Sequence, residues 1–169
     1  MADTGNDRIM RYTEGSNTGV LVAGGNGQGN DTNQLNYPMG IYFESLSNSL
    51  LIANTKAHNI VRWRIGDSNW TLIAGNLNAS RGNSSFLLSN PYGLTVDPIG
   101  NLYVADTSNH RIQFFSIGQT EGKTIAGITG FQGFNSNLLS FPYSLAFDNQ
   151  LNLYIADTYG NRVQKFLRY

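Results

Sequence analysis

The side chains best suited to chemistry in this 169-residue chain are those of its two histidines, His58 and His110. An imidazole can ligate a metal or act as a general base near neutral pH. Both histidines stand at one position of an internal repeat, which Asp7 and Asn161 hold in other units. The sequence offers no obvious third ligand. We therefore interpret the histidines as turn residues that cap backbone groups, with a metal site as the alternative, and we predict no catalytic residue, metal or cofactor.

Aspartate and arginine recur five residues apart in three units. The pairs are Asp3 with Arg8, Asp106 with Arg111, and Asp157 with Arg162. A further unit lacks both charges, because Asn54 and Asn59 hold the two positions. The loss of both charges in the same unit indicates that the two side chains contact each other, because one charge left alone at a partly buried turn is costly. We expect turn-locking ion pairs, and the alternative is a ring of charges that binds a ligand at a channel mouth.

These residues belong to a repeat of about fifty residues, which three independent landmarks define. The aspartate or asparagine of the pair falls at positions 3, 54, 106 and 157, an Ala-Gly dipeptide ends at positions 24, 75 and 127, and prolines stand at positions 38, 91 and 142. All three landmarks share a spacing of 51 to 53 residues. Such agreement argues against chance.

One full unit, residues 90–140, divides into four short runs of strand-forming residues separated by turn residues. We expect strands, named a to d in order, at 92–97, 101–106, 111–117 and 123–127, followed by a long loop at 128–141. Four antiparallel strands in each of several repeats predict an all-β fold of β-propeller blades. A β-sandwich is the alternative, but it has no need of a fixed sequence period.

The register predicts a single domain with two complete blades between two partial ones. The predicted divisions are 1–36 (partial), 37–89, 90–140 and 141–169 (partial). About three blades form an incomplete, open propeller, because closed propellers use about four to eight. Either the chain is a piece of a longer propeller or two or more chains complete one ring. Open strand edges also favour self-association.

The string LYVADTSNHRIQFF at 102–115, with PYGLTVDPIGN before it, resembles the NHL repeat. The Asn-His-Leu-like triplet that names this family is matched by Asn109, His110 and Arg111. The resemblance covers almost the whole chain and implies an NHL-type β-propeller. NHL propellers serve as interaction platforms in ubiquitin ligases, as RNA-binding domains and as relatives of an amidating lyase. The fold does not choose among these functions, although the lyase needs a histidine cluster that this composition argues against.

Charge and cysteine content narrow the function further. Eleven basic residues balance eleven acidic ones, so the chain lacks the broad positive field of non-specific nucleic-acid or anionic-membrane binding. Without cysteine these residues form no zinc module of the ubiquitin-ligase kind, although the parent protein could be ligase-related. No apolar run approaches a membrane span and no leader is visible, which favours the cytoplasm without fixing the compartment.

The d–a loops and b–c turns of consecutive blades should share one face, since strand direction alternates within a blade. Loops on a rigid scaffold commonly carry binding residues, and exposed aromatic and arginine side chains are common interface anchors. The sequence therefore predicts a non-catalytic platform that binds protein through this face. The candidate contact residues are Tyr37, Arg81, Phe86, His110, Phe131 and Phe134. The alternative is that the aromatic rings pack beneath their own loops.

Two other functions have weaker support from particular residues. Arg62, Trp63 and Arg64 are the best local RNA-binding candidate, but strand alternation separates the ring from the two arginines. A propeller lyase or hydrolase would place acidic residues on the inner strands. Glu44, Asp97 and Asp148 recur at one position there, which favours a structural turn residue.

Overall fold

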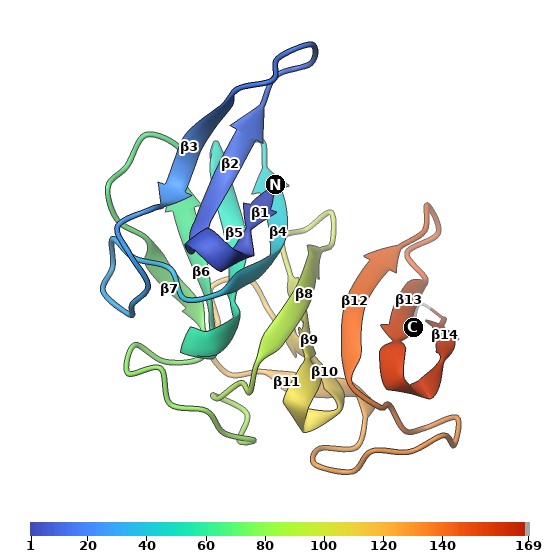
Figure 1. The fold of residues 1–169 in the computed structure, drawn as a ribbon. Coiled ribbons are helices and arrows are strands. Elements are labelled where there is room, and N and C mark those ends of the chain that lie inside the picture. Colours follow the sequence, from blue (N-terminus) through green and yellow to red (C-terminus); the bar gives the residue numbers. More distant parts are fainter. Residues whose placement is uncertain (168–169) are drawn as a thin grey trace.

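The computed structural model describes residues 1–167, whose strands lie in four separate antiparallel sheets (Figure 1). The first sheet contains β1 (Ala2–Asp3), β2 (Arg8–Tyr12) and β3 (Gly19–Gly24). The second contains β4 (Pro38–Glu44), β5 (Ser49–Asn54), β6 (Asn59–Arg64) and β7 (Thr71–Ala74). The third contains β8 (Pro91–Val96), β9 (Leu102–Asp106), β10 (Arg111–Phe115) and β11 (Lys123–Gly127). The fourth contains β12 (Pro142–Phe147), β13 (Leu153–Asp157) and β14 (Arg162–Phe166).

This architecture confirms the predicted all-β, open propeller with four-stranded units. In the third sheet the observed strands follow the expected ranges closely, with one correction. The third strand was expected to reach residue 117, but β10 ends at Phe115. The chain turns there because the Ser116 carbonyl accepts a hydrogen bond from the Gln119 N–H at 2.9 Å. The short β1 pairs with β2 and occupies the place of strand b in the first sheet.

Each b–c connection is a single 3-10 turn followed by one residue in the left-handed region. The turns are η1 (Thr4–Asn6), η2 (Thr55–Ala57), η3 (Thr107–Asn109) and η4 (Thr158–Gly160). The residues that follow have positive φ angles of 49° (Asp7), 56° (His58), 56° (His110) and 49° (Asn161). Asp, Asn and His are the residues other than Gly that tolerate this conformation best. The backbone therefore restricts the residue types at the position that the two histidines share.

The sheets lie side by side, with the inner strands β4, β8 and β12 next to one another (Figure 1). Apolar clusters fill each space between neighbouring sheets. One strand-c position shows this packing clearly, because Ile9, Ile60 and Ile112 are at most 1% exposed. Val163 holds the same position in the fourth sheet, where no described sheet follows, and is 69% exposed. Burial therefore depends on the neighbouring sheet.

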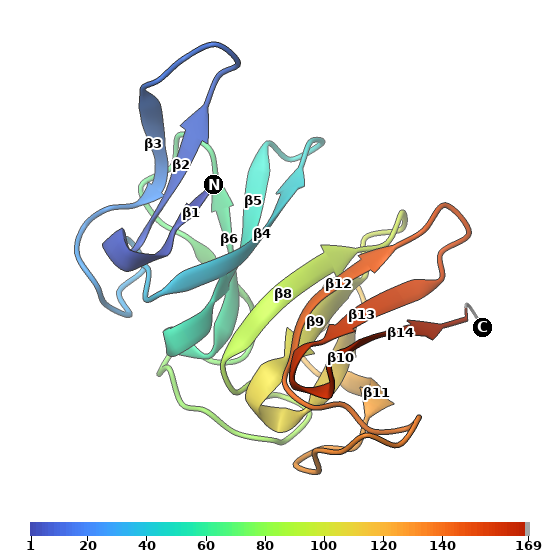
Figure 2. The same cartoon turned by 45° about the vertical axis from the view of Figure 1, so that its right-hand side comes forward.

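The row of sheets is open at both ends (Figure 2). Within residues 1–167 the first sheet has no strand beyond β1, and the fourth has none beyond β14. No helix in the same residues has the length and apolar character needed to cross a membrane.

Candidate interaction face

The b–c turns and the long d–a loops lie at one end of the sheets (Figure 1). We call this end the loop face and define it by the four 3-10 turns and by the loops 25–37, 75–90 and 128–141. Five of the six candidate contact residues lie on these loops, and His110 follows one of the turns. The rigidity of this face depends on how the loops are fastened to the sheets.

Three ion pairs with nearly identical geometry connect strands b and c at the loop face. The distance between the arginine Nε and the aspartate Oδ2 is 2.7 Å in Asp3–Arg8, Asp106–Arg111 and Asp157–Arg162. The structure thus brings together each pair that the spacing indicated. In the third sheet both side chains are buried, with exposures of 3% for Arg111 and 0% for Asp106. The pair is therefore part of the interior and not a charged surface ring.

The remaining nitrogens of Arg111 hold the d–a loop that precedes its own sheet. Nη1 donates to the Asn83 carbonyl at 2.9 Å, and Nη2 donates to the carbonyls of Ser84 at 2.9 Å and Leu87 at 3.0 Å. Arg162 repeats this pattern on the next loop, to Phe134, Asn135 and Leu138. Each arginine is a clamp that fixes backbone carbonyls of one long loop.

The pKa values of the Asp106 and Asp3 carboxyls are shifted in opposite directions. Burial raises the pKa of the Asp106 carboxyl above its usual range, against the opposing effect of Arg111 and of the hydrogen bonds it accepts from Asn109 and the Ser89 N–H. Asp3, at the open end of the first sheet, behaves differently. Hydrogen bonds from Arg8 and Asn6 hold its pKa below the usual range. Because Asp106 is buried, its carboxylate depends on the neighbouring charge of Arg111 to stay ionised.

The second sheet holds its loop without an arginine. The backbone N–H of Trp70 donates to the Thr32 carbonyl and its Nε1 donates to the Gln34 carbonyl, both at 2.8 Å. Asn54 and Asn59 remain buried at the positions of the missing charges. Within residues 1–167, the Asn54 Nδ2 and the Asn59 Oδ1 are buried without a hydrogen-bond partner. Sequence reasoning missed Trp70, because it lies outside the repeated motif.

A threonine in each of the first three turns fastens one sheet to the next, and this contact was also missed. Thr4, Thr55 and Thr107 donate through Oγ1 to the proline carbonyl that begins the next inner strand, at 2.6 to 2.7 Å. The signal was present in the sequence, since a threonine follows the Asp or Asn in all four units and a proline recurs with the same period.

The histidines occupy a second fastening between sheets. The Nδ1 of His58 accepts the Asn90 N–H at 3.1 Å, and the Nδ1 of His110 accepts the Phe141 N–H at 3.2 Å. In the first unit the Asp7 carboxylate accepts an equivalent backbone N–H. Burial lowers the pKa of both histidines, which favours the neutral ring that can accept these bonds.

The candidate contact residues separate into exposed and enclosed side chains. Phe86, Phe131 and Phe134 are 50%, 68% and 71% exposed, and Arg81 is exposed as well. Tyr37 is half-buried, with the Lys56 Nζ 4.3 Å from its ring centroid. His110 differs, because it is only 8% exposed and packs edge-on against the Phe141 ring. Phenylalanines and Arg81 thus form the accessible part of the face.

A row of aromatic rings on the inner strands adjoins the loops and was not singled out from the sequence. Tyr92 and Tyr143 stack with their centroids 4.4 Å apart, and Tyr159, which is 59% exposed, lies 4.9 Å from Phe141. Burial, together with neighbouring Tyr159, raises the pKa of Tyr143. The repeated Pro-Tyr dipeptides at 91–92 and 142–143 could have indicated this row.

The residues behind the RNA and enzyme alternatives have structural roles. Arg62 forms a bidentate ion pair with Glu44, at 2.9 and 3.1 Å, and Trp63 is buried. Asp97 accepts the N–H groups of Ile99 and Asn101 in its turn, and Asp148 accepts the equivalent pair in the fourth sheet. Three or more histidine, aspartate or glutamate side chains do not gather as a metal site anywhere in the described chain.

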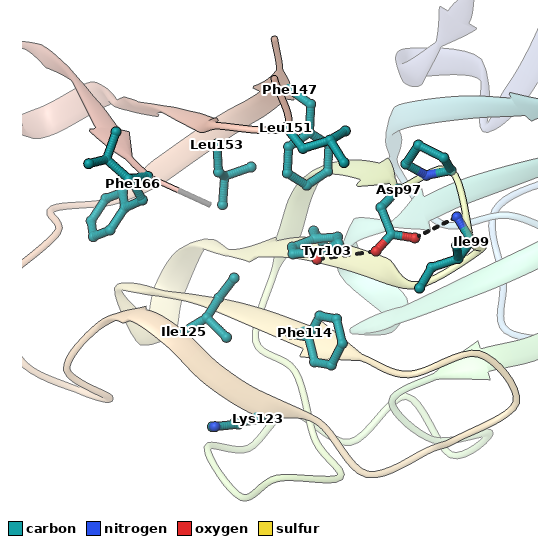
Figure 3. Close-up of a pocket in the computed structure, with 12 residues that line it drawn as sticks. Asp97, Ile99, Tyr103, Phe114, Lys123, Ile125, Phe147, Leu151, Leu153 and Phe166 are labelled. Carbon is teal, nitrogen blue, oxygen red and sulfur yellow. Dashed lines mark hydrogen bonds between the residues drawn. The ribbon is translucent and has the colours of Figure 1, made fainter. Parts of the chain in front are cut away.

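A pocket of about 520 Å³ opens at the opposite end of the third and fourth sheets (Figure 3). Its walls are mostly apolar and include Phe114, Ile125 and Phe166. Asp97 reaches its rim, where it accepts hydrogen bonds from the Tyr103 hydroxyl at 3.3 Å and the Ile99 N–H at 3.1 Å. This pocket is remote from the loop face.

Comparison with known proteins agrees with this architecture. The NHL repeat model matches residues 88–115 and 139–166. A curated bovine (Bos taurus) relative, NHL repeat-containing protein 2, is 34% identical over 108 residues, which are 61% of this chain and 14% of that protein. This chain therefore spans a small part of that relative.

Two solved structures show the same fold. A structural genomics protein of unknown function from Bacteroides thetaiotaomicron matches with a TM-score of 0.76 at 16% identity, over 95% of this chain and 42% of that one. A catalytically inactive virginiamycin B lyase of Staphylococcus aureus matches with a TM-score of 0.54 at 17% identity, over 80% and 38%. The fold and its turn network are those of an open β-propeller segment. Two stretches of the chain match the NHL repeat, and the whole described chain has the fold of an open β-propeller segment.

Proposed function

We propose that this chain is a non-catalytic NHL-repeat platform that binds protein through its loop face. One observation carries the proposal: Phe86, Phe131 and Phe134 are half or more exposed on loops whose carbonyls Arg111 and Arg162 clamp. Exposing large apolar side chains to water is unfavourable, and binding a partner removes that cost. Aromatic rings on a pre-ordered loop also lose little conformational freedom on binding.

The chemistry of the face favours a protein partner with an apolar pocket. Phe131 and Phe134 stand on one loop, and Arg81 on the neighbouring loop supplies a cation. Buried aromatic anchors near a charged rim are the usual composition of a protein interface. The presence of NHL repeats and the propeller fold of the structural relatives support an interaction module of this kind.

Selection from a displayed protein library against the whole chain tests the proposal. Partners selected by the wild-type chain should lose roughly tenfold or more in affinity when Phe131→Ala and Phe134→Ala are combined, because anchor truncation costs more than about 1.4 kcal/mol. The matched control combines Leu46→Ala and Ile99→Ala, which lie on turns of the opposite end and are 105% and 76% exposed. Equal losses in both variants would reject the loop face as the binding surface.

RNA binding and enzymatic turnover are the alternatives, each with its own test. Strong binding of a single-stranded RNA oligonucleotide that weakens steeply with salt would favour the RNA alternative, although Arg62 is already paired with Glu44. The similar fold of a lyase shows that such scaffolds also carry enzymes. Reproducible lyase or hydrolase turnover by this chain would replace the present proposal. A ubiquitin-ligase relation of the parent protein stays a hypothesis about residues outside this chain.

A further inference from the structure

Two tyrosine rings stack between the third and fourth sheets, close to the loop face. Tyr92 is the second residue of β8 and Tyr143 is the second residue of β12, and these two strands lie side by side (Figure 2). The ring centroids are 4.4 Å apart, and the ring planes differ by 20°. The contact is made between two described sheets, so neither end of the sequence takes part in it.

A third phenol, that of Tyr159, connects this pair to the surface. Its ring centroid lies 6.1 Å from that of Tyr143. Burial and hydrogen bonding with Tyr159 and Tyr92 raise the pKa of Tyr143 above its usual value, so the three hydroxyl groups lie near one another. Tyr159 is 59% exposed, whereas Tyr92 and Tyr143 are half-buried. An electron removed from Tyr159 can therefore be replaced from Tyr143 over a short distance.

The exposure of Tyr159 follows from its place in a b–c turn. Lys56 holds the equivalent position in the second sheet, and it is also exposed although the third sheet follows it. The stacked pair, in contrast, is particular to one place in the row of sheets. Met39 holds the position of Tyr92 in the second sheet, so the second and third sheets cannot form such a pair.

The composition of the chain favours tyrosine as the residue that an oxidant attacks. The sequence contains no cysteine, so no thiol of this chain competes for the oxidant. The indoles of Trp63 and Trp70 are shielded, because these residues are only 3% and 4% exposed. Oxidation that begins at exposed Tyr159 should therefore pass inward to the stacked pair.

From this geometry we infer that Tyr92 and Tyr143 form an oxidative modification site, at which a haem peroxidase and hydrogen peroxide join the two rings as a dityrosine cross-link. Each phenol gives one electron and its hydroxyl proton to the oxidant, and hydrogen peroxide is reduced to two molecules of water. The two phenoxyl radicals then form one bond between ring carbons ortho to the oxygens. The hydrogen on each of these carbons moves to the oxygen of the same ring, which restores both aromatic rings.

The cross-link ties the inner strands of two neighbouring sheets together. It closes a loop of about fifty residues, so it should restrict the unfolded chain as a disulfide does. The site is independent of the proposed protein binding, because the reaction needs neither a partner protein nor the phenylalanines of the loops. Failure of one proposal therefore leaves the other open to its own test.

Peroxidase treatment of the purified chain, followed by trypsin digestion and mass spectrometry, tests the inference. The monomeric product should show dityrosine fluorescence and should contain peptide 82–111 joined to peptide 124–162, with the loss of two hydrogens. Tyr92→Phe should abolish this joined pair, because its ring can still stack but has no phenol to oxidise. The cross-linked monomer should also unfold at a higher urea concentration than the untreated chain.

Tyr103→Phe is the matched control for Tyr92→Phe. Tyr103 lies on the same tryptic peptide, but its ring packs against Phe114 and Phe147 at centroid distances of 5.1 and 4.8 Å. This variant should give the joined peptides in the wild-type yield. Tyr159→Phe should slow the reaction and leave the joined residues unchanged, because it removes the exposed phenol.

Four results would overturn the inference. The first is an undiminished yield of the joined peptides in Tyr92→Phe. The second is a cross-link within peptide 124–162, which would place the coupling between Tyr143 and Tyr159. The third is coupling only between separate chains, seen as covalent dimers without a cross-linked monomer. The fourth is an unchanged urea midpoint of the cross-linked monomer, because the bond would then not tie the two sheets together.

Discussion

The second and third sheets fasten equivalent loops with different chemistry. In the third sheet the guanidinium of Arg111 contacts three loop carbonyls while its Nε neutralises buried Asp106. In the second sheet both charges are absent, and the Trp70 Nε1 contacts the Gln34 carbonyl of the equivalent loop. The Trp70 backbone N–H also contacts the Thr32 carbonyl, but the third sheet has the equivalent bond from the Gly122 N–H to the Ser85 carbonyl. The restrained groups are backbone carbonyls in both cases. The feature that persists is therefore the fixed loop backbone, and the residue that fixes it can change.

The ion pair and the indole differ in the free-energy cost of burying them and of losing one partner. A buried ion pair requires desolvation of both charges and becomes strongly unfavourable if one partner is lost. An indole adds apolar burial and needs only one acceptor for its N–H. The second sheet nevertheless keeps two buried asparagines, and one polar atom of each, the Asn54 Nδ2 and the Asn59 Oδ1, lacks a partner within the described residues. Substitutions in the two sheets should therefore have different consequences.

Removal of the third-sheet clamp should have the largest effect. Arg111→Ala leaves Asp106 buried and uncompensated and releases the loop carbonyls, which should lower the free energy of unfolding by about 3–5 kcal/mol. Urea denaturation measures this change. The matched control is Arg8→Ala, because the side chains of Arg8 and Asp3 are 39% and 29% exposed. Its cost should stay at or below about 1 kcal/mol, and similar losses in both variants would contradict the clamp.

Introducing the charge pair into the second sheet tests whether Asn54 and Asn59 occupy the positions of an ion pair. Asn54→Asp and Asn59→Arg should each destabilise the chain, because each buries one unpaired charge. Together they should recover stability, with a coupling free energy of about 1–3 kcal/mol in a double-mutant cycle. Additive effects would show that the two positions do not form the ion pair that their counterparts form.

Trp70→Phe should have a smaller and more local effect. The substitution removes the Nε1 hydrogen bond to the Gln34 carbonyl and leaves a buried ring, so about 1–2 kcal/mol should be lost. Hydrogen exchange should quicken in residues 29–36. Trp63→Phe is the control, because its Nε1 donates to the Asp67 carbonyl instead. Faster exchange of residues 29–36 in the Trp63→Phe variant would show that Trp70 has no special role in fixing this loop.

The smallest expected effect concerns pH. His58 and His110 have pKa values below the ordinary 6.5, because burial disfavours their charged forms. As pH falls below about 6.5, the unfolded chain binds protons first, so stability declines down to the folded pKa. Asn holds this position at Asn161. Replacing both histidines by Asn should therefore reduce the slope of the thermal midpoint against pH between pH 7 and pH 5. An unchanged slope would show that these rings do not titrate with folding.

The sequence predicts the blades well because their signals are local and repeated. The spacing of Asp106 and Arg111 identifies their contact, since both lie beside one turn. The acceptors of Arg111 could not be read in the same way, because they lie 24 to 28 residues upstream in a loop of irregular sequence. The indole of Trp70 has no counterpart at the equivalent Gly122, so its bond to the Gln34 carbonyl could not be read from the repeat. The threonine contacts were predictable in principle from their period, but the partner carbonyl belongs to the next sheet.

Site-specific photocrosslinking identifies the surface of this chain that a protein partner contacts. Benzoylphenylalanine would replace Phe134 on the loop face or, as the matched position, Ile99 at the opposite end, and a partner obtained by selection would be irradiated with each chain. We predict a covalent adduct from position 134 and none from position 99. An adduct from position 99 alone, or equal adducts from both, would contradict a platform that binds protein through its clamped loops.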